Sequence, residues 1–267
     1  MPSTNFACVN GNFVAETEAR VSIFDRGFLH GDAAFETMRV YNGKIFRLDE
    51  HLARLANALT ALQISTEPPT RGLVNELIQR NAIRDGVVRV TVTRGHETPS
   101  HILTAQPRSF DAAPRPLRAI VSSIRVHAQL AQLKTANRLP YTLAKLEADR
   151  ANADEALLLN ESGHLAEFSA ANIFVVKDAA LYTPPVKDGA LPGITRAVVL
   201  ELAKQLKIST RQKSLPQNFL DDADEVFATN SLIEIAPVAT WSRQHKITAQ
   251  LHSAYRVLVA QQLASAK

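Results

Sequence analysis

Three short stretches of this chain contain residues that could do chemistry together. Lys134 lies in the stretch LKTAN, and a lysine amine that is removed from water has a lowered pKa and can form a Schiff base with a carbonyl compound. Glu167 lies in the apolar stretch HLAEF, where a buried carboxylate needs a cationic or hydrogen-bonding partner. The stretch LPGITR at 191–196 is typical of a tight turn that enters a helix, whose unpaired N–H groups can bind phosphate.

Each of these stretches also has a simpler interpretation. A solvent-exposed lysine, a glutamate on the surface of a hairpin and an ordinary loop-to-helix transition would account for the same residues, and their spacing alone does not require that they meet. Together, however, an amine, a carboxylate and a phosphate-binding helix start are the three groups that pyridoxal 5′-phosphate needs from a protein. The amine binds the aldehyde, the carboxylate keeps the pyridine nitrogen protonated, and the helix start holds the phosphate.

Composition and charge argue against several other classes of protein. The net charge is +4, but the basic residues form no run, so we expect a mildly basic surface rather than a nucleic-acid-binding one. No apolar stretch approaches the length of a membrane span. His96 and His101 lack a third ligand, and the single cysteine cannot form an internal disulfide or a metal cluster, so no metal site is expected. With no basic-then-apolar profile at the first residues, the sequence predicts a cytoplasmic protein.

The elements that must position these residues begin with an antiparallel meander. Asn-Gly pairs at 10–11 and 42–43 stand between β-prone runs and predict hairpins, because a type I′ turn needs two positive φ angles. Asp49 occupies a predicted helix N-cap, followed by leucines at helical spacing. Strands are predicted at 87–93 and 117–126.

The pattern weakens over residues 127–137, which we interpret as a junction between domains. Pro140 marks a helix start, because proline in the first turn loses no helical hydrogen bond. Beyond it we expect strands at 155–159, 165–168, 172–176, 180–183 and 225–229, a helix from 194 to 206 and a terminal helix over 250–264. Hairpin order with irregularly placed helices favours an α+β fold. The predicted domains are a small one over 1–126, a linker over 127–137 that carries or adjoins Lys134, and a large one over 138–267.

A series of ordered blocks covers almost the whole chain and resembles one enzyme family. The blocks are FDRGFLHGD at 24–32, FETMR at 35–39, EHLARL at 50–55, KTAN at 134–137, DEALL at 154–158, EFSAANIF at 167–174, LPGITR at 191–196, DEVF at 224–227 and EIAPV at 234–238. The chain resembles the class IV, fold-type IV pyridoxal-phosphate enzymes. That family includes branched-chain and D-amino-acid aminotransferases, (R)-selective amine transaminases and aminodeoxychorismate lyase.

The resemblance implies a role for each matching residue. Lys134 would bind the cofactor as an internal aldimine and move a proton between Cα and C4′, and Glu167 would pair with the pyridine nitrogen. The implied phosphate ligands are Arg54, Gly193, Ile194, Thr195 and Thr229. The family fold implies a small N-terminal α/β domain, a larger β-barrel-like C-terminal domain, and a homodimer in which loops of both subunits approach each active site.

The branch of the family is left open by departures from its patterns. Branched-chain enzymes have a tyrosine five residues after the lysine, where this chain has Leu139, although Arg39 resembles an arginine of that branch. D-amino-acid enzymes place an arginine and a histidine after Thr-Arg-Gly; this chain has His101, but Pro99 stands where the arginine would be. Asn137-Arg138-Leu139 and Thr229-Asn230-Ser231 resemble the lyase. The candidate substrate-binding residues are His30, Phe35, Arg39, Arg94, His101 and Asn230.

Two enzymatic hypotheses follow from the resemblance. An aminotransferase would move an amino group from an amino acid or amine donor, through pyridoxamine phosphate, to a 2-keto acid, and we favour it because several branches share that chemistry. Aminodeoxychorismate lyase would instead release pyruvate and leave 4-aminobenzoate. A cofactor-free binding protein with the same fold is a third interpretation, which the presence of both Lys134 and Glu167 disfavours.

Overall fold

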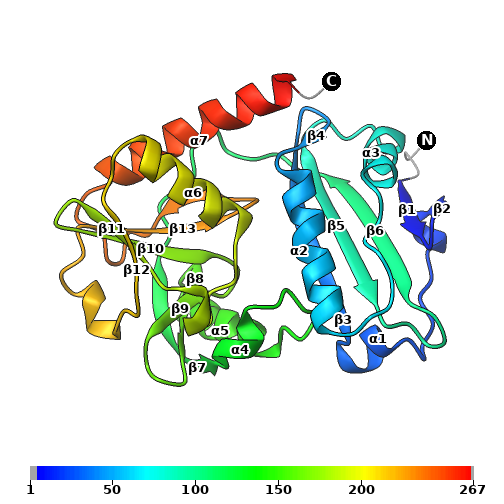
Figure 1. Cartoon of the computed structure of the whole chain (residues 1–267), viewed down its shortest axis with the longest axis horizontal. Helices are drawn as coiled ribbons and strands as arrows, with labels where there is room; N and C mark the ends of the chain where they lie inside the picture. Colours follow the sequence, from blue (N-terminus) through cyan, green and yellow to red (C-terminus); the bar gives the residue numbers. More distant parts are fainter. Residues whose placement is uncertain (1–4, 266–267) are drawn as a thin grey trace. The chain divides into compact units, whose positions relative to one another are not determined.

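The computed structural model describes residues 5–265, which form two compact units. Unit 2 consists of Ala112–Gln132 and Arg138–Gln261, and unit 1 of the rest of the described chain. Both units combine antiparallel strands with helices, so the α+β prediction is confirmed (Figure 1). No helix in this part of the chain is long and apolar enough to cross a membrane.

Unit 1 is built on a six-stranded antiparallel sheet with the strand order β2-β1-β6-β5-β3-β4. Its strands are β1 (Phe6–Val9), β2 (Asn12–Ala15), β3 (Ala33–Tyr41), β4 (Lys44–Ile45), β5 (Gly86–Thr93) and β6 (Ser100–Pro107). Its helices are η1 (Glu16–Glu18), α1 (Arg26–His30), α2 (Leu48–Ala61) and α3 (Arg71–Arg80). Side chains of α2 and α3 pack with alternate residues of β3, β5 and β6 in one core, so both helices cover the same face of the sheet (Figure 1).

The two Asn-Gly pairs of unit 1 form the predicted hairpin turns. Asn10 and Gly11 have φ of 51° and 81°, and Asn42 and Gly43 have φ of 46° and 80°. The prediction that Asp49 is a helix N-cap is wrong, because α2 begins at Leu48 and its N-cap is Arg47, in the left-handed conformation. Asp49 lies instead in the first helical turn, where a carboxylate interacts favourably with the helix dipole.

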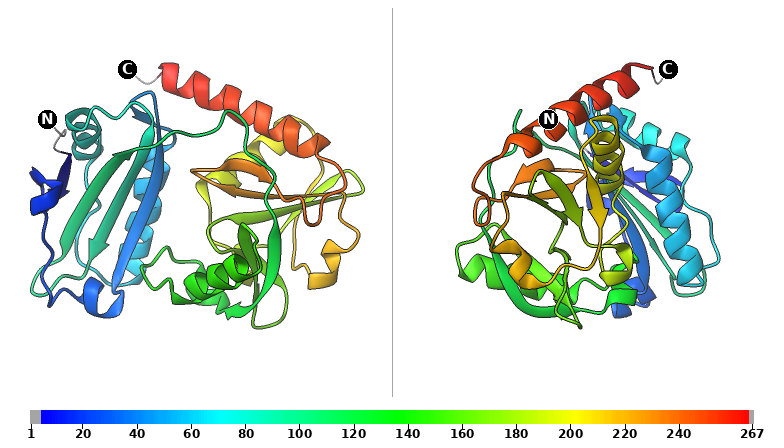
Figure 2. Two further views of the ribbon diagram at one scale, coloured as in Figure 1. Left: turned by 180° about the vertical axis from the view of Figure 1, so that it is seen from behind. Right: turned by 60° about the vertical axis from the view of Figure 1, so that its left-hand side comes forward.

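Unit 2 contains two sheets, seen from two further sides in Figure 2. The five-stranded sheet has the order β12-β11-β10-β13-β14, and the three-stranded sheet has the order β7-β8-β9. The strands are β7 (Ala119–Val126), β8 (Glu155–Asn160), β9 (Leu165–Phe168), β10 (Asn172–Lys177), β11 (Ala180–Thr183), β12 (Thr210–Gln212), β13 (Glu225–Asn230) and β14 (Glu234–Pro237). Isolated bridges between Leu117 and Val238 and between His164 and Pro216 link residues next to these strands. Closure into a barrel stays a prediction.

The helices of unit 2 pack against its sheets, and one of them, α6, begins in the predicted phosphate-binding stretch. They are α4 (Ala128–Ala131), α5 (Leu139–Arg150), η2 (Val186–Asp188), α6 (Ile194–Gln205), η3 (Gln217–Leu220) and α7 (Lys246–Ser265), whose last residues belong to unit 1. Tyr141, Ala144 and Ala148 of α5 pack against β7 and β8. Pro140 lies in the first turn of α5, as predicted.

The observed division of the chain differs from the predicted boundary at residue 126. The units divide between Asp111 and Ala112, because β7 pairs in parallel with β8 and therefore belongs to unit 2. Such a parallel pairing joins segments that are distant in sequence, so a local pattern does not reveal it. Residues Leu133–Asn137 belong to unit 1, because Thr135 forms an antiparallel bridge with Ala34.

Candidate active site

Lys134 is held against the edge of β3 by backbone pairing. The N–H of Phe35 donates to the carbonyl oxygen of Lys134 at 3.0 Å. The N–H of Ala136 donates to the carbonyl oxygen of Ala33 at 2.8 Å. β4 pairs with the last two residues of β3, Val40 and Tyr41. The segment around Lys134 pairs on the same edge of the sheet with the first residues of β3, where Thr135 bridges to Ala34. The side-chain Nζ of Lys134 lies 4.6 Å from the centre of the Phe35 ring. Lys134 thus has a defined place in unit 1, although its segment is not a regular strand.

Glu36, the next residue of β3, is the centre of a buried ionic cluster. Arg54 donates from Nε to Oε1 and from Nη2 to Oε2 of Glu36, both at 2.7 Å, and Nδ1 of His51 lies 2.7 Å from Oε2. Burial by itself would raise the pKa of Glu36, but the Arg54 charge and the hydrogen bonds from His51 and Arg54 lower it to about 2. The carboxylate is therefore ionised and fixes the orientation of Arg54.

His51 is held in its neutral form by the same surroundings. Burial lowers its pKa most, and the charges of Arg54 and Lys134 lower it further, against the opposing effect of Glu36. A neutral imidazole can still donate its Nδ1 proton to Glu36. The predicted phosphate ligand Arg54 is therefore braced by buried Glu36, which His51 contacts in turn. The contact of Arg54 with a phosphate stays a prediction.

In unit 2, the carboxylate of Glu167 is buried and accepts hydrogen bonds on both of its oxygens. Tyr141 donates its hydroxyl to Oε1 at 3.1 Å, and Oε2 accepts from Asn172 Nδ2 at 3.3 Å and from the N–H of Leu191 at 2.9 Å. Donors that converge on a carboxyl group favour its ionised form. Burial lowers the pKa of Arg196 while the charge of Glu167 raises it, so this buried guanidinium also interacts with the carboxylate. Glu167 is thus a buried carboxyl group in a fixed orientation.

Tyr141 donates a hydrogen bond to the Glu167 carboxylate and keeps its own proton. Burial and the charge of Glu167 raise the pKa of its hydroxyl well above the usual range, so it stays protonated. The guanidinium of Arg138 lies 3.7 Å from the centre of the Tyr141 ring and donates to the carbonyl oxygen of Ser169. The ring is therefore fixed from one face by a cation.

The predicted phosphate-binding stretch forms the start of α6. Gly193 is the N-cap and Ile194 the first helical residue, and no side chain caps the first turn. A Cβ on Gly193 would lie 2.0 Å from Asn172 Oδ1, so a side chain there would force Asn172 or the loop to shift. The first N–H groups of a helix have no partner within it, which makes this turn an anion-binding position. Thr195, in the same turn, is buried.

Thr229 adds a buried hydroxyl that no described residue pairs with. Its side chain is 1% exposed, and its Oγ1 has no hydrogen-bond partner among residues 5–265. Thr229 on β13 stands directly opposite Asn172 on β10 in the sheet. A buried, unsatisfied hydroxyl needs an acceptor, and a phosphate oxygen supplies one. Unit 2 therefore contains group types that suit pyridoxal 5′-phosphate: a buried acceptor at Glu167, an uncapped helix start after Gly193, and the hydroxyl of Thr229. That Glu167, Gly193, Thr195 and Thr229 bind this cofactor stays a prediction.

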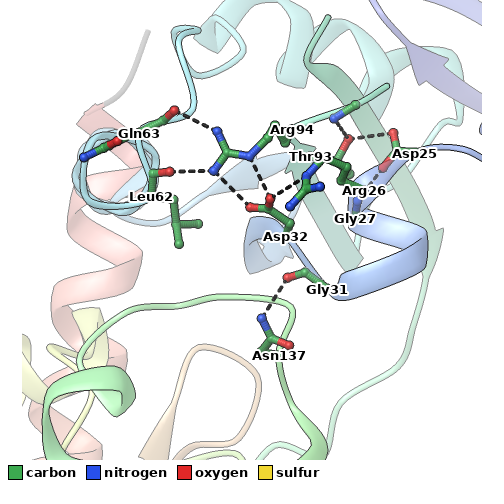
Figure 3. A network of polar contacts seen from close by, with 11 residues as sticks. Asp25, Arg26, Gly27, Gly31, Asp32, Leu62, Gln63, Thr93, Arg94 and Asn137 are labelled. Carbon is green, nitrogen blue, oxygen red and sulfur yellow. Dashed lines mark hydrogen bonds and ion pairs between the residues drawn. The ribbon is translucent and has the colours of Figure 1, made fainter. Parts of the chain in front are cut away.

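Arg94, one of the candidate substrate residues, belongs to a network of polar contacts in unit 1 (Figure 3). Its Nε and Nη2 donate to the carboxylate of Asp32 at 2.7 and 3.2 Å, and its Nη1 and Nη2 donate to the carbonyl oxygens of Gln63 and Leu62 at 2.9 and 2.7 Å. Arg26 also donates to Asp32, at 3.1 Å. Arg94 thus ties the end of α2 to the residue before β3, and a substrate would compete with these partners.

The other candidates of unit 1 lie in different surroundings. His30 is exposed at the end of α1, and His101 contacts the hydroxyl of Thr66 at 2.9 Å. Burial lowers the pKa of His101, so the ring is neutral at pH 7. The buried guanidinium of Arg39 lies 3.8 Å from the centre of the Phe110 ring and 4.5 Å from that of Tyr41. The substrate roles of these residues stay predictions.

Asn230, the candidate in unit 2, shapes the turn after β13. Its Oδ1 accepts from the N–H groups of Leu232 and Ile233, both at 2.8 Å, and its Nδ2 donates to the carbonyl oxygen of Ala170 at 2.9 Å. This turn contains the lyase-like pair Asn230-Ser231. The contacts of Asn230 within the protein account for an asparagine at this position even if it binds no substrate.

Two residues of the Glu167 site, Tyr141 and Asn172, are absent from the candidates drawn from the sequence. The branched-chain pattern has its tyrosine five residues after the lysine, whereas Tyr141 stands seven residues after Lys134, in the first turns of α5. Asn172 lies in the sequence block that contains Glu167. A polar residue at the start of an otherwise apolar strand is the sequence feature that could have identified it. Across the described ranges, no group of three His, Cys, Asp or Glu side chains could hold a metal ion.

Comparisons with known proteins agree with this geometry. The family model described as amino-transferase class IV matches residues 33–241. A protein of Methanocaldococcus jannaschii, named putative branched-chain-amino-acid aminotransferase, is 39% identical over 250 residues, which cover 86% of this chain and 85% of that protein. The D-alanine aminotransferase of Listeria innocua is 32% identical and covers 92% of this chain and 93% of its own length. Among solved structures, the branched-chain aminotransferase of the archaeon Thermoproteus uzoniensis with norvaline has a TM-score of 0.89 at 28% identity, over 96% of this chain and 95% of its own.

Proposed function

The chain belongs to the class IV aminotransferases, and on that premise we propose that it uses pyridoxal 5′-phosphate, bound through Lys134, to move an amino group from an amino acid or amine donor to a 2-keto acid. The family predicted from the sequence blocks is confirmed, and the chain is an enzyme, a transaminase of this class. The two curated relatives described above are named aminotransferases, which gives the lyase alternative less support.

The observation that carries the cofactor proposal is the buried carboxylate of Glu167. Tyr141, Asn172 and the N–H of Leu191 donate hydrogen bonds that orient it and favour its charged form. A buried anion held in this orientation is suited to face a cationic ligand group, and a protonated pyridine nitrogen is such a cation. The unsatisfied hydroxyl of Thr229 and the uncapped start of α6 support a phosphate group on the same ligand.

When bound, pyridoxal 5′-phosphate supplies a ring that accepts the electron pair left at the substrate Cα. The residues of this chain do the rest. The Nζ of Lys134 would hold the cofactor, and it would then accept the proton from the substrate Cα and pass it to C4′ of the cofactor. Glu167 keeps the ring nitrogen positively charged. Gly193, Ile194, Thr195 and Thr229 bind the phosphate, with Arg54 as a further ligand.

The substrates, the assembly and the cellular location are finer parts of the proposal. Relatives named for branched-chain amino acids and for D-alanine support an amino acid donor and a 2-keto acid acceptor. Five large apolar side chains between Val21 and Leu29 are exposed in unit 1 and support a protein contact there, which a homodimer would supply. Light scattering of the purified protein should then give twice the mass of the chain, and fractionation should place it in the cytoplasm.

A half-reaction scan without a keto-acid acceptor tests the reaction. Holoenzyme is mixed with L-amino acids, D-amino acids or (R)-1-phenylethylamine, and the conversion of the cofactor to its pyridoxamine form is followed by absorbance. Conversion by one of these donors supports transamination and identifies the branch. Production of 4-aminobenzoate and pyruvate from aminodeoxychorismate, with no conversion by any donor, would favour the lyase instead.

A further inference from the structure

Asn172 contacts both ends of the cofactor site in unit 2. Its Nδ2 has two hydrogens, and it donates to Glu167 Oε2 at 3.3 Å and to the carbonyl oxygen of Leu191 at 2.9 Å. The side chain is 4% exposed, so neither bond competes with bulk water. One amide group therefore joins the carboxylate that faces the ring nitrogen to the loop that enters α6.

The loop from Leu191 to Gly193 is tied at several points around this amide. The carbonyl oxygen of Leu191 also accepts from the N–H of Gly193 at 2.7 Å, and the N–H of Leu191 donates to Glu167 at 2.9 Å. On its other side, Asn172 Oδ1 occupies the space that a Cβ of Gly193 would take. The amide, the carboxylate and the loop form a closed set of contacts, so a shift of one moves the others.

The position of Asn172 in the sheet extends this connection to Thr229. The two residues are directly opposite in the pairing of β10 with β13, and opposite residues of a sheet project from the same face. Thr229 carries the hydroxyl without a partner among the described residues. Asn172 thus bonds Glu167, lies beside Gly193 and stands opposite Thr229, three of the unit 2 residues that the proposed function assigns to the cofactor.

We propose that Asn172 is a positioning residue that holds Glu167 and the phosphate-binding loop at a fixed spacing, so that one cofactor molecule meets both at once. The inference rests on the proposed function, because it assumes that Glu167 and the start of α6 bind the same ligand. An aspartate at this position would keep the shape of the side chain, but it would lose the donor and bring a second carboxylate beside Glu167.

The test measures the binding of two ligands. Pyridoxamine 5′-phosphate has no aldehyde and forms no covalent bond with Lys134, and pyridoxamine also lacks the phosphate. Calorimetric titrations compare the cofactor-free wild-type protein with Asn172→Ala and Asn172→Asp. We expect either variant to raise the Kd for pyridoxamine 5′-phosphate about tenfold or more, as when a buried hydrogen bond to a charged group is lost. The Kd for pyridoxamine should rise less, because that ligand does not reach the phosphate loop.

Asn81→Ala is the matched control. The Asn81 amide makes three partly buried hydrogen bonds: it accepts from the N–H of Phe6 at 2.7 Å and donates to the carbonyl oxygens of Phe6 at 2.9 Å and Ala105 at 3.3 Å. Asn81 lies in unit 1 and contacts none of the residues proposed to bind the cofactor. It should lower the melting temperature and leave both Kd values within twofold of wild type.

Three results would overturn the inference. A folded Asn172 variant that binds pyridoxamine 5′-phosphate within twofold of wild type would leave Asn172 with a structural role only. Equal losses of affinity for pyridoxamine 5′-phosphate and pyridoxamine would mean that Asn172 acts through Glu167 alone and not on the phosphate-binding loop. A loss in Asn81→Ala as large as in the Asn172 variants would attribute the effect to stability. Failure of the wild-type protein to bind either ligand would contradict the proposed function itself, which is a distinguishable outcome.

Discussion

The backbone N–H of Phe35 donates to the carbonyl oxygen of Lys134 at 3.0 Å, while the ring of Phe35 lies 4.6 Å from Nζ of the same lysine. One residue of β3 thus holds both the backbone and the side chain of the proposed cofactor-binding residue. The next residue of the strand, Glu36, turns to the opposite face and braces Arg54. Adjacent positions of a single strand therefore support two different groups of the proposed site.

Glu36→Gln should destabilise the protein strongly. The substitution removes a buried charge and leaves the guanidinium of Arg54 without its ionic partner, which typically costs about 3–5 kcal/mol. Chemical denaturation measures the free energy of unfolding. The control is Glu76→Gln, which breaks an exposed pair with Arg80 and should cost about 0.5 kcal/mol or less. Equal effects of the two substitutions would refute the importance of the buried cluster.

The stability that Glu36 provides should depend on pH in a defined window. Its pKa is lowered from a usual value of 4.5 to about 2, so between these values the unfolded state binds more protons than the folded state. The contribution is fully present above pH 4.5 and is lost as the pH falls toward 2. Denaturation curves across this range should show the difference between wild type and Glu36→Gln shrinking with falling pH. A constant difference would contradict the assignment.

Glu167→Gln should leave the cofactor bound and slow the half-reaction. A neutral amide cannot stabilise a protonated pyridine nitrogen as a carboxylate does, and the loss of a charged hydrogen bond corresponds to a rate about tenfold to hundredfold lower. Stopped-flow absorbance with a saturating amino donor measures the rate. Unchanged turnover would mean that Glu167 only stabilises the fold.

Gly193→Ala should weaken cofactor binding. The new Cβ would meet Asn172 Oδ1 at 2.0 Å, so the loop or the asparagine must move. Gly72→Ala is the control, because its Cβ meets nothing closer than 3.8 Å on the surface of α3, where alanine favours the helix. Titration with pyridoxal 5′-phosphate should show a higher Kd for the first variant alone. Equal affinities would show that the turn tolerates a side chain and does not need glycine.

Local features of the fold were predictable from the sequence, whereas its long-range pairings were not. The turns at Asn10-Gly11 and Asn42-Gly43, the start of α5 at Pro140 and the start of α6 after Gly193 each depend on a few neighbouring residues. The parallel pairing of β7 with β8 joins segments separated by α4 and α5, which explains why the division of the chain falls at Asp111 and not at residue 126. Periodicity carries no information about such a partner.

The same distinction applies to the candidate site. The residue types at Lys134, Glu167 and 191–196 indicated their chemistry, and the resemblance to a family supplied their roles. The hydroxyl of Tyr141 reaches Glu167 across 26 positions of sequence, and the amide of Asn172 reaches Leu191 across 19. Neither contact follows from spacing, because each depends on how α5 and the loop before α6 pack on the sheets of unit 2.

The central claim is that Lys134 binds the cofactor, and reductive trapping tests it most directly. Borohydride reduces the C=N bond between a lysine and pyridoxal 5′-phosphate to a stable amine, and peptide mass spectrometry then locates the pyridoxyl group. We predict that wild-type holoenzyme carries it on Lys134 and that Lys134→Ala carries none. A pyridoxyl group on another lysine, or a trapped adduct that survives in Lys134→Ala, would contradict the account.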